Sequence, residues 1–164
     1  MFRKMRRFKQ ELSAAEAQGV LERGSCGVLA CLGDEDYPYT VPLSYVYNDG
    51  HIYFHSAVEG HKIDALRRCA KVSFCVIEQD LVVPEELTTY FRSAIAFGRA
   101  RLVEDAEEKR AALTLLGLRY LPDGDGEVRK HIDEAIRRTA VVDIEIEHLT
   151  GKEARELMER RNKS

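Results

Sequence analysis

The sequence lacks a long apolar run, a secretory leader pattern and a zinc-binding cysteine pattern. No run of about 18 apolar residues occurs, so no membrane-spanning helix and no membrane partner are expected. The basic N-terminus is not followed by an apolar core of about 7–15 residues, so cytoplasmic localisation is expected. The four cysteines, whose spacing matches no zinc signature and which we expect to be free thiols in a reducing compartment, are Cys26, Cys31, Cys69 and Cys75.

Several catalytic motifs are also missing. The chain has no G-x-S-x-G nucleophile elbow and no glycine pattern for binding a dinucleotide. The triplet Gly60-His61-Lys62 does not fit the phosphate loop GxxxxGK[ST], because residue 55 is His and residue 63 is Ile. These absences argue against a serine hydrolase of that type and against a nucleotide-hydrolysing loop.

Length and charge indicate one domain over residues 1–164. The chain is 45% apolar and carries a net charge of −3, which suits a compact core and gives no overall sign of a nucleic-acid partner. Residues 1–12 form a basic arm, because MFRKMRRFK has five basic residues in nine. Such an arm can contact RNA or an acidic lipid surface. We expect it instead to be solvated or packed on a neighbouring subunit.

A β-hairpin is predicted around Asn48-Asp49-Gly50. The runs TVPLSYVY and HIYFHS flank it, and Asp-Gly suits the positive φ angles of a type I′ turn. Tyr45 should then pair with Phe54, and Ser44 with His55. One face of the hairpin is apolar and belongs in a core: Val41, Leu43, Tyr45, Ile52 and Phe54. The other face is too polar for a core and too aromatic for a solvent-exposed surface without a binding role: Thr40, Pro42, Ser44, His51, Tyr53 and His55.

Helices are predicted from capping patterns. Ser13 and Glu16 form a capping box for a helix that Gly24 ends. GHKIDALRRC reads as a short helix, and Asp105 caps a longer one. A further helix is expected over 127–138. Thr150-Gly151-Lys152-Glu153 has the form of another capping box, so a C-terminal helix is expected over 150–164.

The remaining strands complete a mainly β, α+β fold. CGVLACL and KVSFCVI are compact apolar runs that read as buried strands. TTYFRSAIAFGRARLV is long enough to curl around a barrel, with a bend permitted at Gly98. VVDIEIEH alternates, and we expect its apolar residues to face inward (Val142, Ile144, Ile146) and its acids outward (Asp143, Glu145, Glu147). An antiparallel barrel with peripheral helices follows.

The segment YNDGHIYFHSAVEGHK holds three of the five histidines. His51 and His55 share a strand face but lie about 13 Å apart, too far to ligate one ion, so no metal site is predicted. The segment runs from a strand end into a helix start, where free amides and a partial positive charge favour an anion. Ser56, His61 and Lys62 would form a monophosphate cradle there. Ordinary solvent-exposed turn residues are the alternative.

In this order and spacing, three segments resemble the pyridoxamine 5′-phosphate oxidase-like flavoproteins, and among them the branch of the 5-nitroimidazole resistance proteins. The segments are VPLSYVYNDGHIYFHSAVEGHKIDALRRCAKVSFCV, TTYFRSAIAFGRARLVED and VVDIEIEHLTGKEA, spanning most of 38–154. The resemblance implies a six-stranded antiparallel split barrel that forms a homodimer. One FMN would lie in each of two clefts between the protomers.

The resemblance also implies which residues contact FMN. The flavin ring would lie along one strand (Thr40, Val41, Pro42 and Ser44), with the paired strand adding Phe54 and His55. The phosphate would be held by Ser56, His61 and Lys62. The partner protomer would contribute Tyr90, Arg92 and Ser93. His55 or Tyr90 would act as proton donor over the ring, and a purely structural hydrogen-bonding role is the alternative for His55.

Two departures from the family pattern bear on function. The chain has no Trp and ends in ARELMERRNKS, without the C-terminal segment that holds the substrate of pyridoxamine phosphate oxidases, so oxidation of vitamin B6 is not expected. The family's usual basic residue on the first hairpin strand is missing, and this region reads Tyr39-Thr40. The expected function is FMN-dependent reduction of a small electron-poor molecule such as a nitroaromatic, with electrons from NAD(P)H or another reductase. The alternatives are non-catalytic binding of FMN or haem, and a cofactor-free domain that binds RNA through its basic arm.

Overall fold

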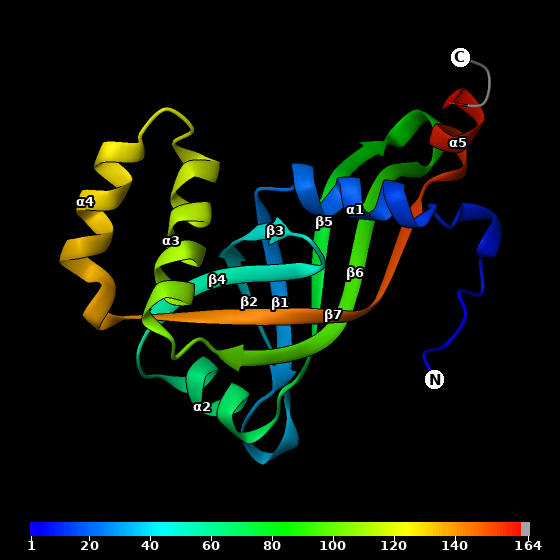
Figure 1. Ribbon diagram of the computed structural model, residues 1–164. Helices are drawn as coiled ribbons and strands as arrows, with labels where there is room; N and C mark the ends of the chain where they lie inside the picture. The colour runs from blue at the N-terminus through cyan, green and yellow to red at the C-terminus, as the bar shows by residue number, and fades with distance from the viewer. Residues whose placement is uncertain (162–164) are drawn as a thin grey trace.

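The computed structural model describes residues 1–161 and consists of one curled antiparallel sheet with helices around it (Figure 1). The strands are β1 (Cys26–Leu32), β2 (Pro38–Ser44), β3 (Val46–Asn48), β4 (His51–Ala57), β5 (Lys71–Val83), β6 (Thr88–Leu102) and β7 (Thr139–Glu153). The helices are α1 (Ala14–Arg23), α2 (His61–Arg68), α3 (Ala106–Tyr120), α4 (Asp125–Ala135) and α5 (Arg155–Arg161). The strand order is β2-β1-β5-β6-β7-β4-β3, which confirms the predicted antiparallel split-barrel class.

The sheet has seven strands instead of six because the predicted strand of residues 40–47 breaks at Tyr45. Its first half, β2, pairs with β1, and its second half, β3, pairs with β4. The two edges of the sheet are therefore joined through this one residue. The hydroxyl of Tyr120 accepts a hydrogen bond from the Tyr45 amide at 3.1 Å and lies 2.9 Å from the Tyr45 carbonyl. The expected ladder pairs of Tyr45 with Phe54 and of Ser44 with His55 do not form.

The predicted turn between β3 and β4 is confirmed. Asp49 and Gly50 both have positive φ, 46° and 85°, and Asn48 pairs with His51. Beyond the turn, the apolar face of the hairpin enters the core as expected. Three of its residues are fully buried (Tyr45, Ile52 and Phe54), while Val41 and Leu43 pack against the core from β2.

The long strand β6 is confirmed and makes the barrel curl. It pairs with β5 on one side and β7 on the other, and its register against β7 shifts between Phe97 and Gly98. A Cβ atom at Gly98 would collide with the Glu145 carbonyl. Glycine therefore permits the close approach of β6 and β7 at the irregularity.

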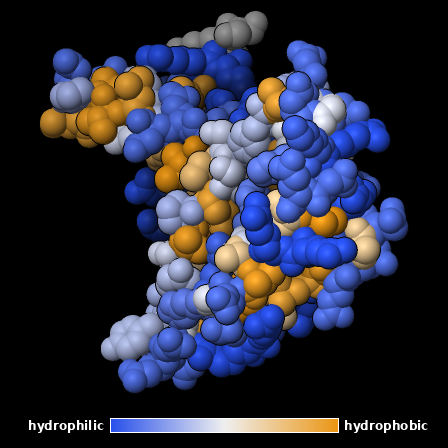
Figure 2. Space-filling view, turned by 90° about the vertical axis from the view of Figure 1, so that its left-hand side faces the viewer, coloured by the Kyte–Doolittle hydropathy of each residue, from blue (hydrophilic) through white to orange (hydrophobic). Residues whose placement is uncertain are grey.

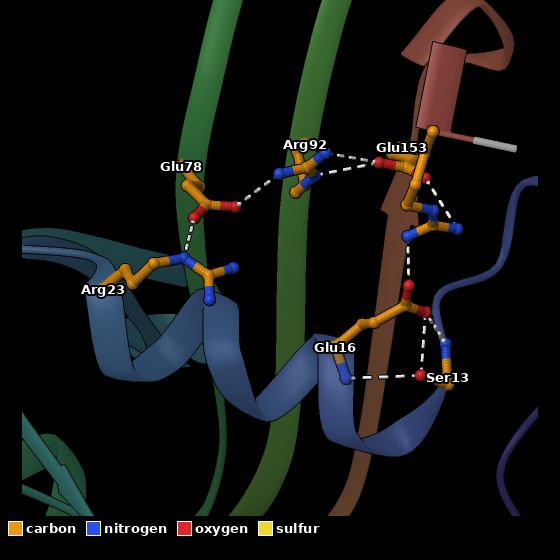
Figure 3. Close-up of polar contacts among 7 residues, drawn as sticks. Ser13, Glu16, Arg23, Glu78, Arg92 and Glu153 are labelled. Carbon is orange, nitrogen blue, oxygen red and sulfur yellow. Dashed lines mark hydrogen bonds and ion pairs between the residues drawn. The ribbon is translucent and has the colours of Figure 1, made fainter. Parts of the chain in front are cut away.

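Strand β7 is longer than predicted, and two expectations about it were wrong. Residues 150–153 continue the strand to pair with β6, and the C-terminal helix begins only at Arg155. The last three residues of the helix predicted over 150–164 lie outside the described part of the chain. The reason is tertiary: the Glu153 side chain is fully buried and pairs with Arg92 at 2.8 Å and Arg161 at 3.1 Å (Figure 3).

The second correction to β7 concerns Asp143, which is buried although it lies on the polar side of the strand. It is only 1% exposed. Its carboxylate pairs with His51 at 2.8 Å and accepts a hydrogen bond from Arg101 at 2.7 Å. Val142 and Ile144 are buried as predicted, and Glu145 is exposed.

Helices α1 and α3 begin where their capping patterns predicted. The Ser13–Glu16 capping box opens α1, and the Asp105 side chain accepts a hydrogen bond from the Glu108 amide at 2.8 Å to open α3. Helix α4 and the following turn of 3₁₀-helix at Ile136–Arg138 match the helix predicted over 127–138, two residues longer at its start. In Figure 1, α3 and α4 stand as a pair beside the barrel, while α1 and α2 lie at opposite ends of it.

The basic arm packs on its own chain. The ring of Phe2 stacks on His148, with centroids 4.6 Å apart, and the Leu12 amide donates to the Gly151 carbonyl at 2.9 Å. The five basic side chains of the arm remain exposed. The apolar residues of the arm thus hold it to β7 and β6 without involving those charges.

Candidate functional site

The start of α2 presents backbone amides at the end of β4. Gly60 precedes the helix with φ of 118°, a conformation that favours glycine. No side chain caps the first turn of α2. Gly60 and His61 are exposed, so the uncapped amides and the positive end of the helix are open to an anion.

Lys62, in the first turn of α2, is a half-buried cation without a counter-ion. Its Nζ lies 5.5 Å from the centroid of the Phe54 ring, and no carboxylate among residues 1–161 forms an ion pair with it. Burial lowers the pKa of the Lys62 ammonium. An anion beside this group would compensate for the hydration that the ammonium loses on burial.

His61 turns toward the loop between β1 and β2. Its ring stacks on Tyr39 with centroids 4.1 Å apart, and its Nε2 lies 3.6 Å from an Asp34 carboxylate oxygen. His61 and Lys62 thus leave α2 in different directions. Tyr39 lies in the region where the family usually has a basic residue. In the structure its ring is instead the partner of the His61 ring.

Arg68 is a functional candidate that the sequence reasoning missed. It donates hydrogen bonds to the carbonyls of Leu32 and Gly33 and lies 3.5 Å from Asp34. The signal was present in the sequence, because Arg68 follows His61 by seven residues, about two helical turns. Both side chains therefore reach the same loop, where Arg68 supplies the charge that the Tyr39-Thr40 segment lacks.

The outer face of β2 is exposed to solvent. Thr40, Pro42 and Ser44 are exposed, whereas Val41 turns inward against the core. Ser56 is half-buried near the end of β4. Phe54 differs from the expectation, since it is fully buried and its ring contacts Lys62 from inside the barrel.

A cavity of about 560 Å³ lies between the barrel and the α3–α4 pair. Two of the predicted site residues, Ser44 and His55, form part of its wall, and most of the rest is apolar. Partial burial against the cavity wall lowers the pKa of His55, although the residue is still exposed to solvent, and the nearby Lys62 and His131 lower the pKa further. The imidazole of His55 is therefore neutral at pH 7.

Tyr90, Arg92 and Ser93 lie on β6 and do not line this cavity. The Tyr90 hydroxyl donates to Glu86 at 2.5 Å. Arg92 donates to Glu153 at 2.9 Å and lies in the ion-pair network of Figure 3. Within one chain the fold does not bring these three residues to His55.

Two further observations concern metal binding and membrane-spanning helices. Among residues 1–161, no three or more His, Cys, Asp or Glu side chains are arranged to hold a metal ion. In the same residues, no helix is long and apolar enough to cross a membrane.

Comparison with known proteins reveals a family and several similar structures. Residues 13–153 match the model of the pyridoxamine 5′-phosphate oxidase family. A Bacteroides thetaiotaomicron protein assigned to 5-nitroimidazole antibiotic resistance is 26% identical, with a TM-score of 0.71, over 87% of this chain and 85% of that one. An FAD-binding protein from Mesorhizobium loti is 31% identical, with a TM-score of 0.61, over 88% of this chain and 96% of that one.

Two other matches are more limited. The FAD and haem binding protein of Mycobacterium smegmatis has a TM-score of 0.77 at 19% identity, over 89% of this chain and 74% of that one, which is a likeness of fold. An uncharacterised protein of Rhizobium meliloti (strain 1021) is 39% identical over 71 residues, or 43% of this chain and 46% of the relative. The match thus spans about half the length of that relative. Because the family model covers nearly the whole described fold, the chain belongs to the pyridoxamine 5′-phosphate oxidase family.

Proposed function

We propose that this protein binds FMN and uses it to reduce a small, electron-poor organic molecule. The observation that carries the proposal is Lys62, a half-buried cation with a lowered pKa, at an uncapped helix start and without an ion-pair partner in the described chain. Family membership supports a flavin, since the Mesorhizobium loti relative is an FAD-binding protein. FAD is accordingly the direct competitor of FMN for this site.

The phosphate of FMN would sit at the start of α2. Lys62 would pair with it, the free amides of the first turn would donate to it, and Ser56 would add a hydroxyl. Arg68 would add positive charge from the side of the β1–β2 loop and His61 would add a ring nitrogen, where Asp34 already engages both. We therefore assign the largest share of phosphate binding to Lys62, whose charge is not shared with a carboxylate.

The flavin ring would lie along the outer face of β2. Thr40, Pro42 and Ser44 are exposed on that face, and Val41 would contribute through its backbone. When bound, FMN supplies hydride chemistry, and the protein supplies orientation and hydrogen bonds. His55 is neutral at pH 7, so its role there is to donate or accept a hydrogen bond beside the ring. Tyr90, Arg92 and Ser93 would reach the ring only from a second protomer.

The test compares FMN with riboflavin, which lacks the phosphate. A charge-assisted hydrogen bond is worth about 1.5–3 kcal/mol, so Lys62→Ala should weaken FMN roughly 10- to 150-fold, at about 1.4 kcal/mol per tenfold. Riboflavin affinity should hardly change. Titration of both flavins into flavin-free protein, followed by fluorescence quenching, measures this. Lys130→Ala, which removes an exposed helical lysine of α4, is the control.

Equal losses of FMN and riboflavin affinity in Lys62→Ala would overturn the phosphate assignment. Titrating FAD in parallel separates the two cofactors, because tighter binding of FAD than of FMN would replace FMN in the proposal. Turnover is a separate measurement. Anaerobic mixing of the reduced flavin-loaded protein with a nitroaromatic should reoxidise the flavin, and a protein that binds flavin without this reaction would be a carrier and not a reductase.

A further inference from the structure

The cavity beside the barrel shares part of its wall, Ser44 and His55, with the proposed binding site of the flavin ring. Ser44 comes from the end of β2 and His55 from β4, while Leu113, Leu116 and Val128 belong to the α3–α4 pair. Its volume of about 560 Å³ falls within the range of about 300–1,000 Å³ typical of small-molecule sites. Figure 2 views the molecule from the side of these helices, where apolar surface appears between polar side chains.

The polar groups of the cavity are few, and several are already used. The Tyr120 hydroxyl is bound to the backbone of Tyr45, and the Thr139 hydroxyl donates to the Ala135 carbonyl. The side chains of Ser44, His55 and His131, by contrast, form no hydrogen bond or ion pair with residues 1–161. A mostly apolar cavity with a few unpaired polar groups is the arrangement that holds and orients a small ligand.

The charge of the cavity favours a neutral occupant. Glu127 is the one acid in its lining, and no lysine or arginine lines it. His55 is neutral at pH 7, since burial lowers its pKa. An anion would find no fixed cation inside, and a cation would give up its hydration for a largely apolar wall.

We propose that this cavity is the substrate site, that it takes a neutral, flat aromatic molecule, and that the polar group of this molecule is held by Ser44, His55 and His131. The inference rests on the proposed function, because Ser44 and His55 also border the proposed ring site. It adds the place of the substrate and the residues that hold its polar group. The apolar rings lie between α3 and α4, and the electron-accepting substituent lies toward β2 and β4.

The first arm of the test uses flavin-free protein and the neutral fluorescent probe N-phenyl-1-naphthylamine. Wild type should bind it saturably with a rise in fluorescence. Ala135→Trp, which places a large ring in the cavity wall, should weaken the probe at least tenfold. Ala111→Trp, at an exposed position of α3, is the matched control and should bind like wild type. Ile136→Trp is a second cavity-filling variant in case Ala135→Trp does not fold.

The second arm tests the polar end. Displacement of the probe by 2-nitronaphthalene and by naphthalene should give a tighter constant for the nitro compound. His131→Phe keeps a ring of similar shape and removes the ring nitrogens. Since one hydrogen bond is worth about 0.5–1.5 kcal/mol, it should weaken 2-nitronaphthalene by roughly 2- to 10-fold and leave naphthalene unchanged.

Three outcomes would overturn the inference: no probe binding to wild type, equal losses in Ala135→Trp and Ala111→Trp, or probe binding that falls as protein concentration rises. The last would mean that a second copy of the chain covers the cavity. Because this assay contains no flavin, it is independent of the Lys62 titration. A failed flavin titration with intact probe binding would overturn the proposed function while supporting the cavity's ligand class.

Discussion

His55 is the residue at which the two proposed sites meet. It lies in the wall of the α3–α4 cavity, and partial burial there, together with the nearby Lys62 from α2 and His131 from α4, lowers the pKa of its imidazole. Glu127 from α4 is the acid in the same cavity lining. A neutral imidazole in this position can exchange hydrogen bonds with a ligand without attracting an anion away from Lys62.

The lowered pKa of His55 predicts how its removal changes the response to acid. Between the folded pKa and the ordinary value of about 6.5, the unfolded state binds more protons, so stability rises with pH and is lost as pH falls through this window. His55→Gln should therefore lose less stability than wild type between about pH 7 and about pH 5. Urea unfolding across that range measures it. An acid response identical to that of wild type would show that His55 has no lowered pKa.

At the scale of elements, the network of Figure 3 joins α1, the middle of the sheet and α5. Arg92 on β6 contacts both Glu153 and Glu78, and Arg161 on α5 contacts both Glu153 and Glu16. The fully buried Glu153 is the centre of this network. Its burial holds the end of β7 in the sheet and sets the point where α5 begins.

Glu153→Gln should destabilise the fold markedly. Breaking a buried ion pair costs about 3–5 kcal/mol, and we expect the lower end because Arg92 and Arg161 are partly exposed. Urea unfolding at neutral pH measures the loss. Glu147 lies on β7 like Glu153, and Glu147→Gln, which breaks an exposed pair with Arg99 of β6, should cost no more than about 1 kcal/mol. Similar losses in both variants would mean that the network does not anchor β7.

At the scale of the whole molecule, the end of the β5–β6 hairpin over residues 79–93, here called the β5–β6 arm, carries exposed apolar side chains. Leu81 is 55% exposed, Val82 65% and Leu87 96%. Apolar surface gathered in this way commonly marks an interface. Tyr90, Arg92 and Ser93 lie on the same arm, so a second copy docked there would be the means of bringing them to a flavin site.

We therefore expect a homodimer in solution that uses this arm. Val82→Glu should shift the protein toward monomer, because a charge would be buried in an apolar contact. Tyr37→Glu, a similarly exposed position outside the arm, should leave the assembly unchanged. Light scattering at micromolar concentration measures both. A wild-type monomer with flavin bound would rule out the shared site, and a dimeric Val82→Glu would place the interface elsewhere.

Much of the candidate site could be predicted from local sequence, because its parts are held by neighbours a few residues away. The β4-to-α2 segment gives the free helix start, Gly60 and Lys62 in that order. Arg68 was recognisable from its spacing to His61 but was not singled out. The cavity over His55 could not be predicted, because its walls come from α3 and α4, which begin 51 and 70 residues after His55 in the chain.

The sequence by itself determined the turn at Asp49-Gly50 and the starts of α1 and α3, since each depends on backbone preferences and hydrogen bonds within about four residues. Only the tertiary structure decided the features that depend on distant partners. Tyr120 contacts the backbone at Tyr45, where the predicted strand divides. Glu153 continues β7 because Arg92 and Arg161 surround it, although the local pattern at 150–153 fits a helix cap equally well. Partners such as these are far apart along the chain and become neighbours only when the barrel curls.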